Sequence, residues 1–152
     1  MKRVLSIQDI SCIGKCSLTV ALPIISAMGI ETSILPTSIL STHTMFNDFT
    51  FRDLTDDMEP IKKHWQKEGF SFDAIYTGYL GSEKQITLVK DYFKTFGNTC
   101  KYIIVDPAMA DNGKLYSGFD KDFPLKMAKL CKYADVILPN ISEAAFMTGM
   151  PY

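Results

Sequence analysis

The sequence predicts an α/β fold in which a mostly parallel sheet carries helices on both faces. Short apolar runs alternate along the chain with longer segments that have helical spacing, and this alternation is typical of βαβ units. Several of the helical segments are followed directly by a glycine, which is a common helix stop. The apolar runs read as buried strands, as expected of a parallel sheet that is covered on both sides.

In the first half of the chain the strands are expected at Arg3–Gln8, Glu31–Leu35 and Ala74–Thr77. Pro36 closes the second strand, because proline lacks the N–H that a sheet needs. The helices are expected at Ser17–Met28 and Leu54–Glu68, each followed by glycine. Pro60 is an alternative start for the second helix, since proline suits the first helical position. Residues 37–52 are expected to form a polar and aromatic loop.

In the second half, Ser82 is expected to cap a helix that ends at Phe96, with Gly97 as its stop. The remaining expected elements are a strand at Tyr102–Val105, a helix at Asp120–Tyr133 and a strand at Asp135–Leu138. Residues Ser142–Thr148 are expected to be the start of another helix.

Composition limits the function classes. The 152 residues correspond to one domain, and 47% of them are hydrophobic, so a packed core is expected. The net charge of −1 and the lack of a basic block argue against a nucleic-acid partner. No apolar run is long enough for a membrane span. The four cysteines lack a zinc pattern, and we expect most of them to be buried, reduced thiols of a cytoplasmic protein.

Polar side chains follow two of the predicted strands directly. Asp106 comes after Tyr102–Val105, and Asn140 and Glu143 come after Asp135–Leu138. Ligands bind at the carboxyl ends of the strands in open parallel sheets, and such a set suits a hydrated magnesium ion. The spacing of Asn140 and Glu143 also fits a helix cap with a capping-box glutamate, which is a purely structural role. Ser142 is a competing cap.

Five segments in order give the chain a resemblance to the pyridoxal/pyridoxamine kinase branch of the ribokinase-like superfamily. They are Leu5–Gln8, Ser41–Thr44, Thr77–Tyr79, Asp106–Tyr116 and Pro139–Glu143. The resemblance implies a ribokinase-like fold of which residues 1–152 are the N-terminal part, so that the sheet is incomplete. It implies a kinase that transfers the γ-phosphoryl group of ATP to the 5′-hydroxymethyl group of a B6 vitamer, in the salvage of pyridoxal 5′-phosphate.

The resemblance also implies roles for single residues. Asp9, Thr44 and Tyr79 would bind the vitamer, although Asp9 stands where many relatives have serine. The nucleotide and phosphate region would contain four residues: Asp106, Asp111, Asn140 and Glu143. Asp106 and Glu143 would serve Mg²⁺, directly or through water, with K⁺ as a second candidate ion. By the same resemblance, Asp111–Tyr116 would belong to the lid that covers bound ATP. A homodimer in the cytoplasm, with no nucleic-acid or membrane partner, is expected.

The Gly-Thr-Gly-Asp turn that supplies the family's catalytic base and anion hole does not occur among these residues. We therefore assign no catalytic residue within them and expect the 152-residue chain to be inactive alone. Two alternatives stay open at this point. One is a hydroxymethylpyrimidine kinase, although such relatives open with a glycine-rich substrate loop where this chain has Gln8–Ser11. The other is a binding or assembly protein without catalysis.

Overall fold

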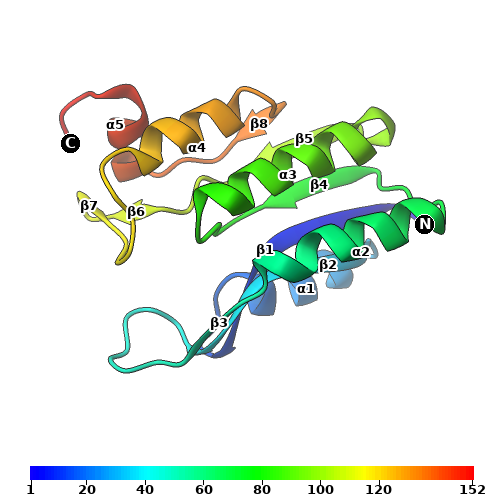
Figure 1. Cartoon of the computed structure of the whole chain (residues 1–152), viewed down its shortest axis with the longest axis horizontal. Coiled ribbons are helices and arrows are strands. Elements are labelled where there is room, and N and C mark those ends of the chain that lie inside the picture. The colour runs from blue at the N-terminus through cyan, green and yellow to red at the C-terminus, as the bar shows by residue number, and fades with distance from the viewer.

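The computed structural model describes residues 1–152 and contains a six-stranded sheet in the order β3-β2-β1-β4-β5-β8 (Figure 1). All neighbouring strands are parallel except β2 and β3. The strands of this sheet are β1 (Arg3–Ile13), β2 (Glu31–Thr42), β3 (Phe51–Asp53), β4 (Ala74–Thr77), β5 (Tyr102–Val105) and β8 (Val136–Ile137). A separate hairpin is formed by β6 (Ala110–Asp111) and β7 (Lys114–Leu115).

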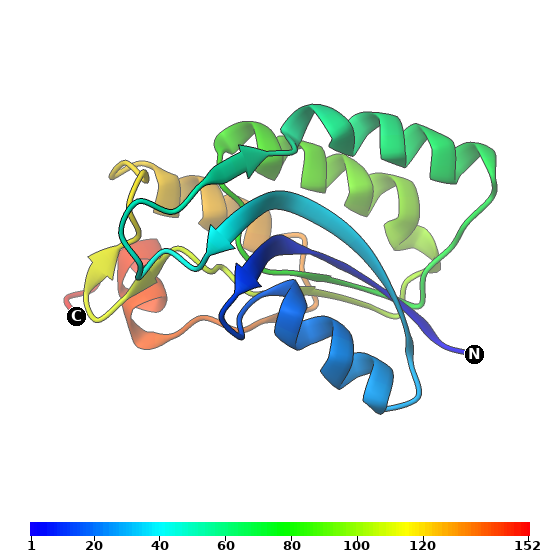
Figure 2. The same ribbon diagram turned by 90° about the horizontal axis from the view of Figure 1, so that it is seen from below.

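Helices lie on both faces of the sheet. In Figure 2, α1 lies alone on one side, next to β1 and β2, while α2, α3 and α4 lie on the other. The helices are α1 (Leu18–Ala27), α2 (Thr55–Lys67), α3 (Glu83–Phe96), α4 (Phe123–Cys131) and α5 (Ile141–Thr148), with a short 3₁₀ turn (Gly97–Thr99) after α3. The expected mostly parallel α/β sheet with helices on both faces is therefore confirmed.

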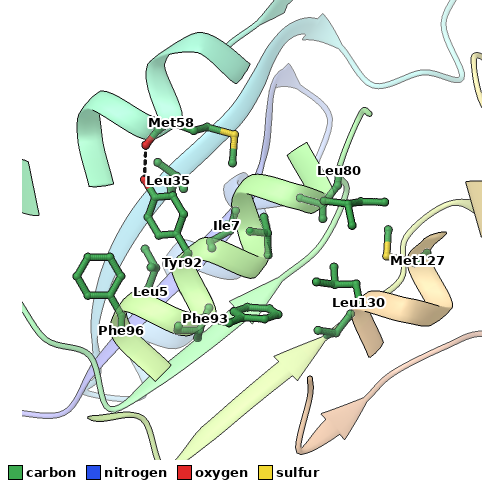
Figure 3. Close-up of a cluster of buried hydrophobic side chains, with 14 of the residues drawn as sticks. Leu5, Ile7, Leu35, Met58, Leu80, Tyr92, Phe93, Phe96, Met127 and Leu130 are labelled. Atoms are coloured by element: carbon green, nitrogen blue, oxygen red, sulfur yellow. Dashed lines mark hydrogen bonds between the residues drawn. The ribbon is translucent and has the colours of Figure 1, made fainter. Parts of the chain in front are cut away.

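The core lies between the sheet and α2, α3 and α4 (Figure 3). Helix α3 turns Ile86, Val89 and Phe93 towards the strands, and these residues recur at the three- and four-residue spacing of one helix face. Leu5 and Ile7 of β1 are fully buried beneath them. Burying one such side chain contributes about 1.5–3 kcal/mol, so this layer anchors the strands whose ends carry the polar residues.

The expected elements are largely present, but the boundary at Pro36 is wrong. Strand β2 continues through Pro36 to Thr42, so residues 37–42 of the expected loop are strand. Pro36 is tolerated because β3 pairs with β2 only from Ser38 onwards, so at the proline β2 has a neighbouring strand on the β1 side alone. The register between β1 and β2 also shifts after the Gln8–Pro36 pair, as in a β-bulge.

Several smaller differences are local. Helix α2 begins at Thr55 and includes Pro60, so the alternative start at the proline is wrong. Asn140, not Ser142, caps α5. The sequence did not predict β3 or the β6–β7 hairpin, which are too short to give a periodic pattern. All four cysteines are free, but Cys12 is exposed and none of the others is fully buried, contrary to the expectation. No helix is long and apolar enough to cross a membrane.

Candidate functional site

A cavity of about 390 Å³ opens at the carboxyl ends of β1, β4 and β5. Two residues that the sequence had singled out, Tyr79 and Asp106, line it together. The other lining residues come from β1, the segment after it, α1, and the ends of β4 and β5: Gln8, Lys15, Cys16, Ser17, Val20, Ala21, Ile24, Ile25, Tyr76, Gly78 and Ala108. Apolar side chains from α1 face the polar strand ends, which is the usual make-up of a small-molecule site.

Tyr79 follows β4 and is half-buried, with its ring 5.6 Å from that of Phe119 between centroids. Its backbone carbonyl accepts a hydrogen bond of 3.2 Å from the Thr37 hydroxyl. Burial raises the pKa of the Tyr79 phenol, and the negative charges of Asp9 and Asp53 raise it further. The neutral phenol therefore presents a flat ring and a hydrogen-bonding group at the cavity wall.

Asp9 lies within β1 at the register shift between Gln8 and Ile10, and it is only 5% exposed. One carboxylate oxygen, Oδ1, has no hydrogen-bond partner, and Oδ2 accepts a long bond of 3.4 Å from the Ser11 hydroxyl. Burial raises the pKa of this carboxyl group, against the opposing effect of hydrogen bonds from Ser17 and Ser11. A buried polar atom without a partner is uncommon, so Asp9 has a free acceptor next to the cavity.

Asp106 follows β5 and is half-buried. Burial raises the pKa of its carboxyl group, while a hydrogen bond from Tyr76 lowers it in part. Gln8 in turn hydrogen-bonds to Tyr76. Gly78 lies against this group, because a Cβ there would come within 2.9 Å of the Gln8 side chain. Tyr76 of β4 and Gln8 of β1 thus lie close to Asp106 at the cavity wall.

Asn140 and Glu143 form the predicted capping box of α5. Asn140 Oδ1 accepts from the Glu143 N–H at 2.9 Å, and Glu143 Oε2 accepts from the Asn140 N–H at 2.8 Å. The same side chains also hold the segment after β5, since Glu143 Oε1 accepts from the Met109 N–H at 3.2 Å and Asn140 Nδ2 donates to the Ala110 carbonyl at 2.8 Å. The first turn of α5 is therefore bound to the start of the β6–β7 hairpin.

Three carboxylates gather on this side of the site, around Tyr116. Burial raises the pKa of the Tyr116 phenol, and the charges of Glu143, Asp111 and Asp106 raise it further. Burial also raises the pKa of Glu143, with a smaller contribution from Asp106. No group of three or more His, Cys, Asp or Glu side chains is close enough to hold a metal ion by itself.

Thr44, another predicted site residue, does not line the cavity. It sits exposed in the turn between β2 and β3. The neighbouring His43 packs against Gly14, whose φ of +102° suits glycine and where a Cβ would collide with the His43 ring. This contact joins the Thr44 turn to the loop after β1, on the Asp9 side of the site.

Five polar or reactive residues of the cavity were not predicted from the sequence: Gln8, Lys15, Cys16, Ser17 and Tyr76. Only Gln8 gave a local signal, as a buried polar residue at the end of an apolar run. Ser17 has a positive φ of 52° just before α1, which no sequence pattern indicates. Tyr76 reads as an ordinary strand residue until the neighbouring strand brings Asp106 beside it.

The phosphomethylpyrimidine kinase family matches residues 30–152 of the chain. Pyridoxal kinase PdxY of Actinobacillus pleuropneumoniae is 28% identical over 99% of this chain and 54% of its own length. A crystal structure from Bacteroides thetaiotaomicron, named for a phosphomethylpyrimidine kinase and solved with pyridoxal, is 45% identical with a TM-score of 0.96, over 99% of this chain and 53% of that one.

The crystal structure of pyridoxal kinase from Lactobacillus plantarum is 38% identical with a TM-score of 0.93, over 100% of this chain and 54% of that one. These likenesses agree with the expected ribokinase-like fold. The chain spans about half the length of the curated relatives it matches, from 49% to 54%.

Proposed function

The chain belongs to the phosphomethylpyrimidine kinase family, and we propose that the complete protein phosphorylates the 5′-hydroxymethyl group of a B6 vitamer with ATP. Residues 1–152 would be the N-terminal part of one ribokinase-like kinase domain. The observation that carries the proposal is the shared cavity of Tyr79 and Asp106, which pairs an aromatic wall with a carboxylate. The Bacteroides thetaiotaomicron structure, solved with pyridoxal, supports the same substrate class.

On the vitamer side, Tyr79 would pack against the pyridine ring. Asp9 would accept a hydrogen bond from a ring substituent or a protonated ring nitrogen, because its Oδ1 atom is buried and unpaired. Thr44 would close the ring site from the β2–β3 turn. The serine of many relatives could donate or accept a hydrogen bond, whereas an ionised Asp9 only accepts, so this position would bias the choice among vitamers.

On the phosphate side, Asp106 fits a magnesium ion best, since its half-buried carboxylate faces the cavity. Glu143 fits such an ion only through water, because both of its oxygens already accept backbone hydrogen bonds. Bound Mg²⁺ would neutralise charge on the phosphate oxygens. Asp111 and the β6–β7 hairpin would cover ATP, with Asn140 holding the hairpin in place. K⁺ is a secondary candidate with no separate support.

The base that takes the proton of the vitamer hydroxyl would come from outside these 152 residues, as would most of the adenine contacts. We propose that the 152 residues alone have no catalytic turnover, because positioning and charge stabilisation carry phosphoryl transfer and part of both would be missing. Cytoplasmic location and a homodimer remain parts of this proposal.

A hydroxymethylpyrimidine kinase is the second candidate, and the family match favours it specifically. A pyrimidine with a hydroxymethyl group presents a similar flat ring and the same acceptor alcohol. A binding or assembly protein without catalysis is the third candidate, which the same assay tests.

The test is an ADP-release assay of the complete protein with ATP, Mg²⁺ and one acceptor at a time: pyridoxal, pyridoxine, pyridoxamine or hydroxymethylpyrimidine. We expect the highest kcat/KM with a B6 vitamer and a large loss in an Asp106→Asn variant. A higher kcat/KM for hydroxymethylpyrimidine would favour the second candidate. No ADP release with any of the acceptors would favour the third.

A further inference from the structure

Gln85, in the first turn of α3, is a buried amide that no part of the site so far uses. It is 1% exposed, yet its side chain bonds to residues far away in the sequence. Gln85 Oε1 accepts from the Gly81 N–H at 2.8 Å. Gln85 Nε2 lies 3.0 Å from the Thr37 carbonyl, 2.9 Å from Thr55 Oγ1 and 3.2 Å from Asp53 Oδ1.

These partners belong to three separate segments. Gly81 lies in the loop after β4, Thr37 lies in β2 at the register shift, and Asp53 and Thr55 form the junction of β3 and α2. The amide nitrogen carries two hydrogens for three acceptors, so it shares them, and the hydroxyl of Thr55 also donates to Asp53. One side chain therefore fixes the distance between these segments.

Tyr79 stands between two of these attachments. Gly81 follows it by two residues, and Thr37 donates its hydroxyl hydrogen to the Tyr79 carbonyl at 3.2 Å. Gln85 bonds to both Gly81 and Thr37. The backbone of Tyr79 is therefore restrained through the chain that leads to Gly81 and through its own hydrogen bond with Thr37. The β2–β3 unit, which carries Thr44 in its turn, is held by the same amide through Thr37 and Asp53.

We propose that Gln85 is a positioning residue for the vitamer, which sets the separation between Tyr79 and the β2–β3 turn. This inference rests on the proposed function for the identity of the ligand. Gln85 is buried behind the cavity wall rather than lining the cavity, so it acts through Tyr79 and not by touching substrate. The phosphate-side residues Asp106 and Glu143 have no bond to this network, so ATP binding should not depend on it.

Two variants of the complete protein test this inference. Gln85→Met keeps the size but removes every hydrogen bond of the amide. Thr37→Val keeps the shape of Thr37 and its carbonyl but removes the hydroxyl that holds Tyr79. The control is Tyr92→Phe on the same helix, which loses one buried hydrogen bond of 2.6 Å to the Met58 carbonyl (Figure 3) and leaves every hydrogen bond of Gln85 in place.

We expect both test variants to raise the KM for the vitamer by about tenfold, with the KM for ATP changed by less than about twofold, since a tenfold change corresponds to about 1.4 kcal/mol of lost positioning. Tyr92→Phe should lower the denaturant midpoint without changing either KM. If Tyr92→Phe raises the vitamer KM equally, or if KM for ATP rises in parallel, the inference is wrong. If Gln85→Met does not fold, Thr37→Val decides alone.

Hydrogen exchange separates this inference from the proposed function. Gln85→Met should speed exchange of the Gly81 amide by about tenfold or more, because its acceptor is lost, while Tyr92→Phe should not. Unchanged exchange at Gly81 overturns the role of Gln85 even if the enzyme is active. If the wild-type protein phosphorylates no vitamer, the proposed function fails and with it the positioning of a vitamer, whatever the exchange result.

Discussion

Glu143→Gln tests how the phosphate side of the site is held together. The carboxylate is 2% exposed and each of its oxygens accepts one backbone N–H, from Asn140 and from Met109. A glutamine side chain has only one oxygen. If that oxygen keeps the capping-box bond, the new NH₂ group faces the Met109 N–H, and two donors meet in a buried place.

The size of the effect follows from these two bonds. A buried N–H without a partner costs about 1–3 kcal/mol. The variant also removes a buried charge. Burying that charge costs free energy, as the raised pKa of Glu143 indicates, so its removal offsets part of the lost stability. We expect the free energy of unfolding to fall by about 1 kcal/mol. The hairpin should also loosen, so the magnesium requirement should rise and kcat should fall.

The assay is denaturant unfolding of the complete protein, together with kinetics at several magnesium concentrations. Glu83→Gln is the matched control, because Glu83 also lies in the first turn of a helix but only pairs with Lys126 at the surface, at 2.8 Å. Such a pair contributes about 1 kcal/mol or less, and kinetics should not change. Equal effects of the two variants on stability and magnesium dependence would refute the reasoning.

Three further outcomes are expected. Burial raises the pKa of Asp9, so the stability that this group contributes is present below the ordinary aspartate pKa and is lost as the pH rises through the folded-state pKa. Asp9→Asn should therefore become more stable relative to wild type over that pH range. Unfolding at several pH values is the measurement, and a relative loss of stability of Asp9→Asn with rising pH would contradict the prediction. Thr44→Val should raise the vitamer KM by about two- to tenfold at unchanged stability, since one hydrogen bond is lost at an exposed site; a rise in the KM for ATP alone would exclude Thr44 as a vitamer contact. The 152-residue chain alone should self-associate through exposed apolar residues at β8. Ile137→Lys should weaken this association, as measured by light scattering. A wild-type chain that is monomeric at micromolar concentration would contradict this prediction.

The sequence predicts the strands and caps that depend on neighbours in the chain. Tyr102–Val105 is recognisable because a run of apolar residues suits a buried strand, and β5 has the predicted bounds. Ser82 accepts from the Gln85 N–H at 3.2 Å, as a helix cap does. The capping box is likewise recognisable from the sequence, because Asn140 and Glu143 lie three residues apart, and the structure contains it.

What the sequence could not predict depends on contacts between distant segments. Strand β2 can pass through Pro36 because no strand pairs with it there on the side away from β1. The order of the strands cannot be predicted from neighbouring residues in the sequence. Glu143 also binds Met109, 34 residues away, and Gln85 binds Thr37, 48 residues away. A glutamine within a helix gives no sign of such partners, because its spacing and propensity are those of any helical residue.

The two sides of the site use the same structural device. Residues at the carboxyl edge of the sheet lie in loops, and loops have few backbone partners of their own. In each case a side chain in the first turn of a helix binds the backbone of a loop at this edge: Gln85 of α3 holds Gly81, and Glu143 of α5 holds Met109. Because the two networks share no residue, their variants should affect different substrates. Gln85→Met should act on the vitamer and Glu143→Gln on the nucleotide, and the two effects on free energy should add in the double variant, as expected of independent sites.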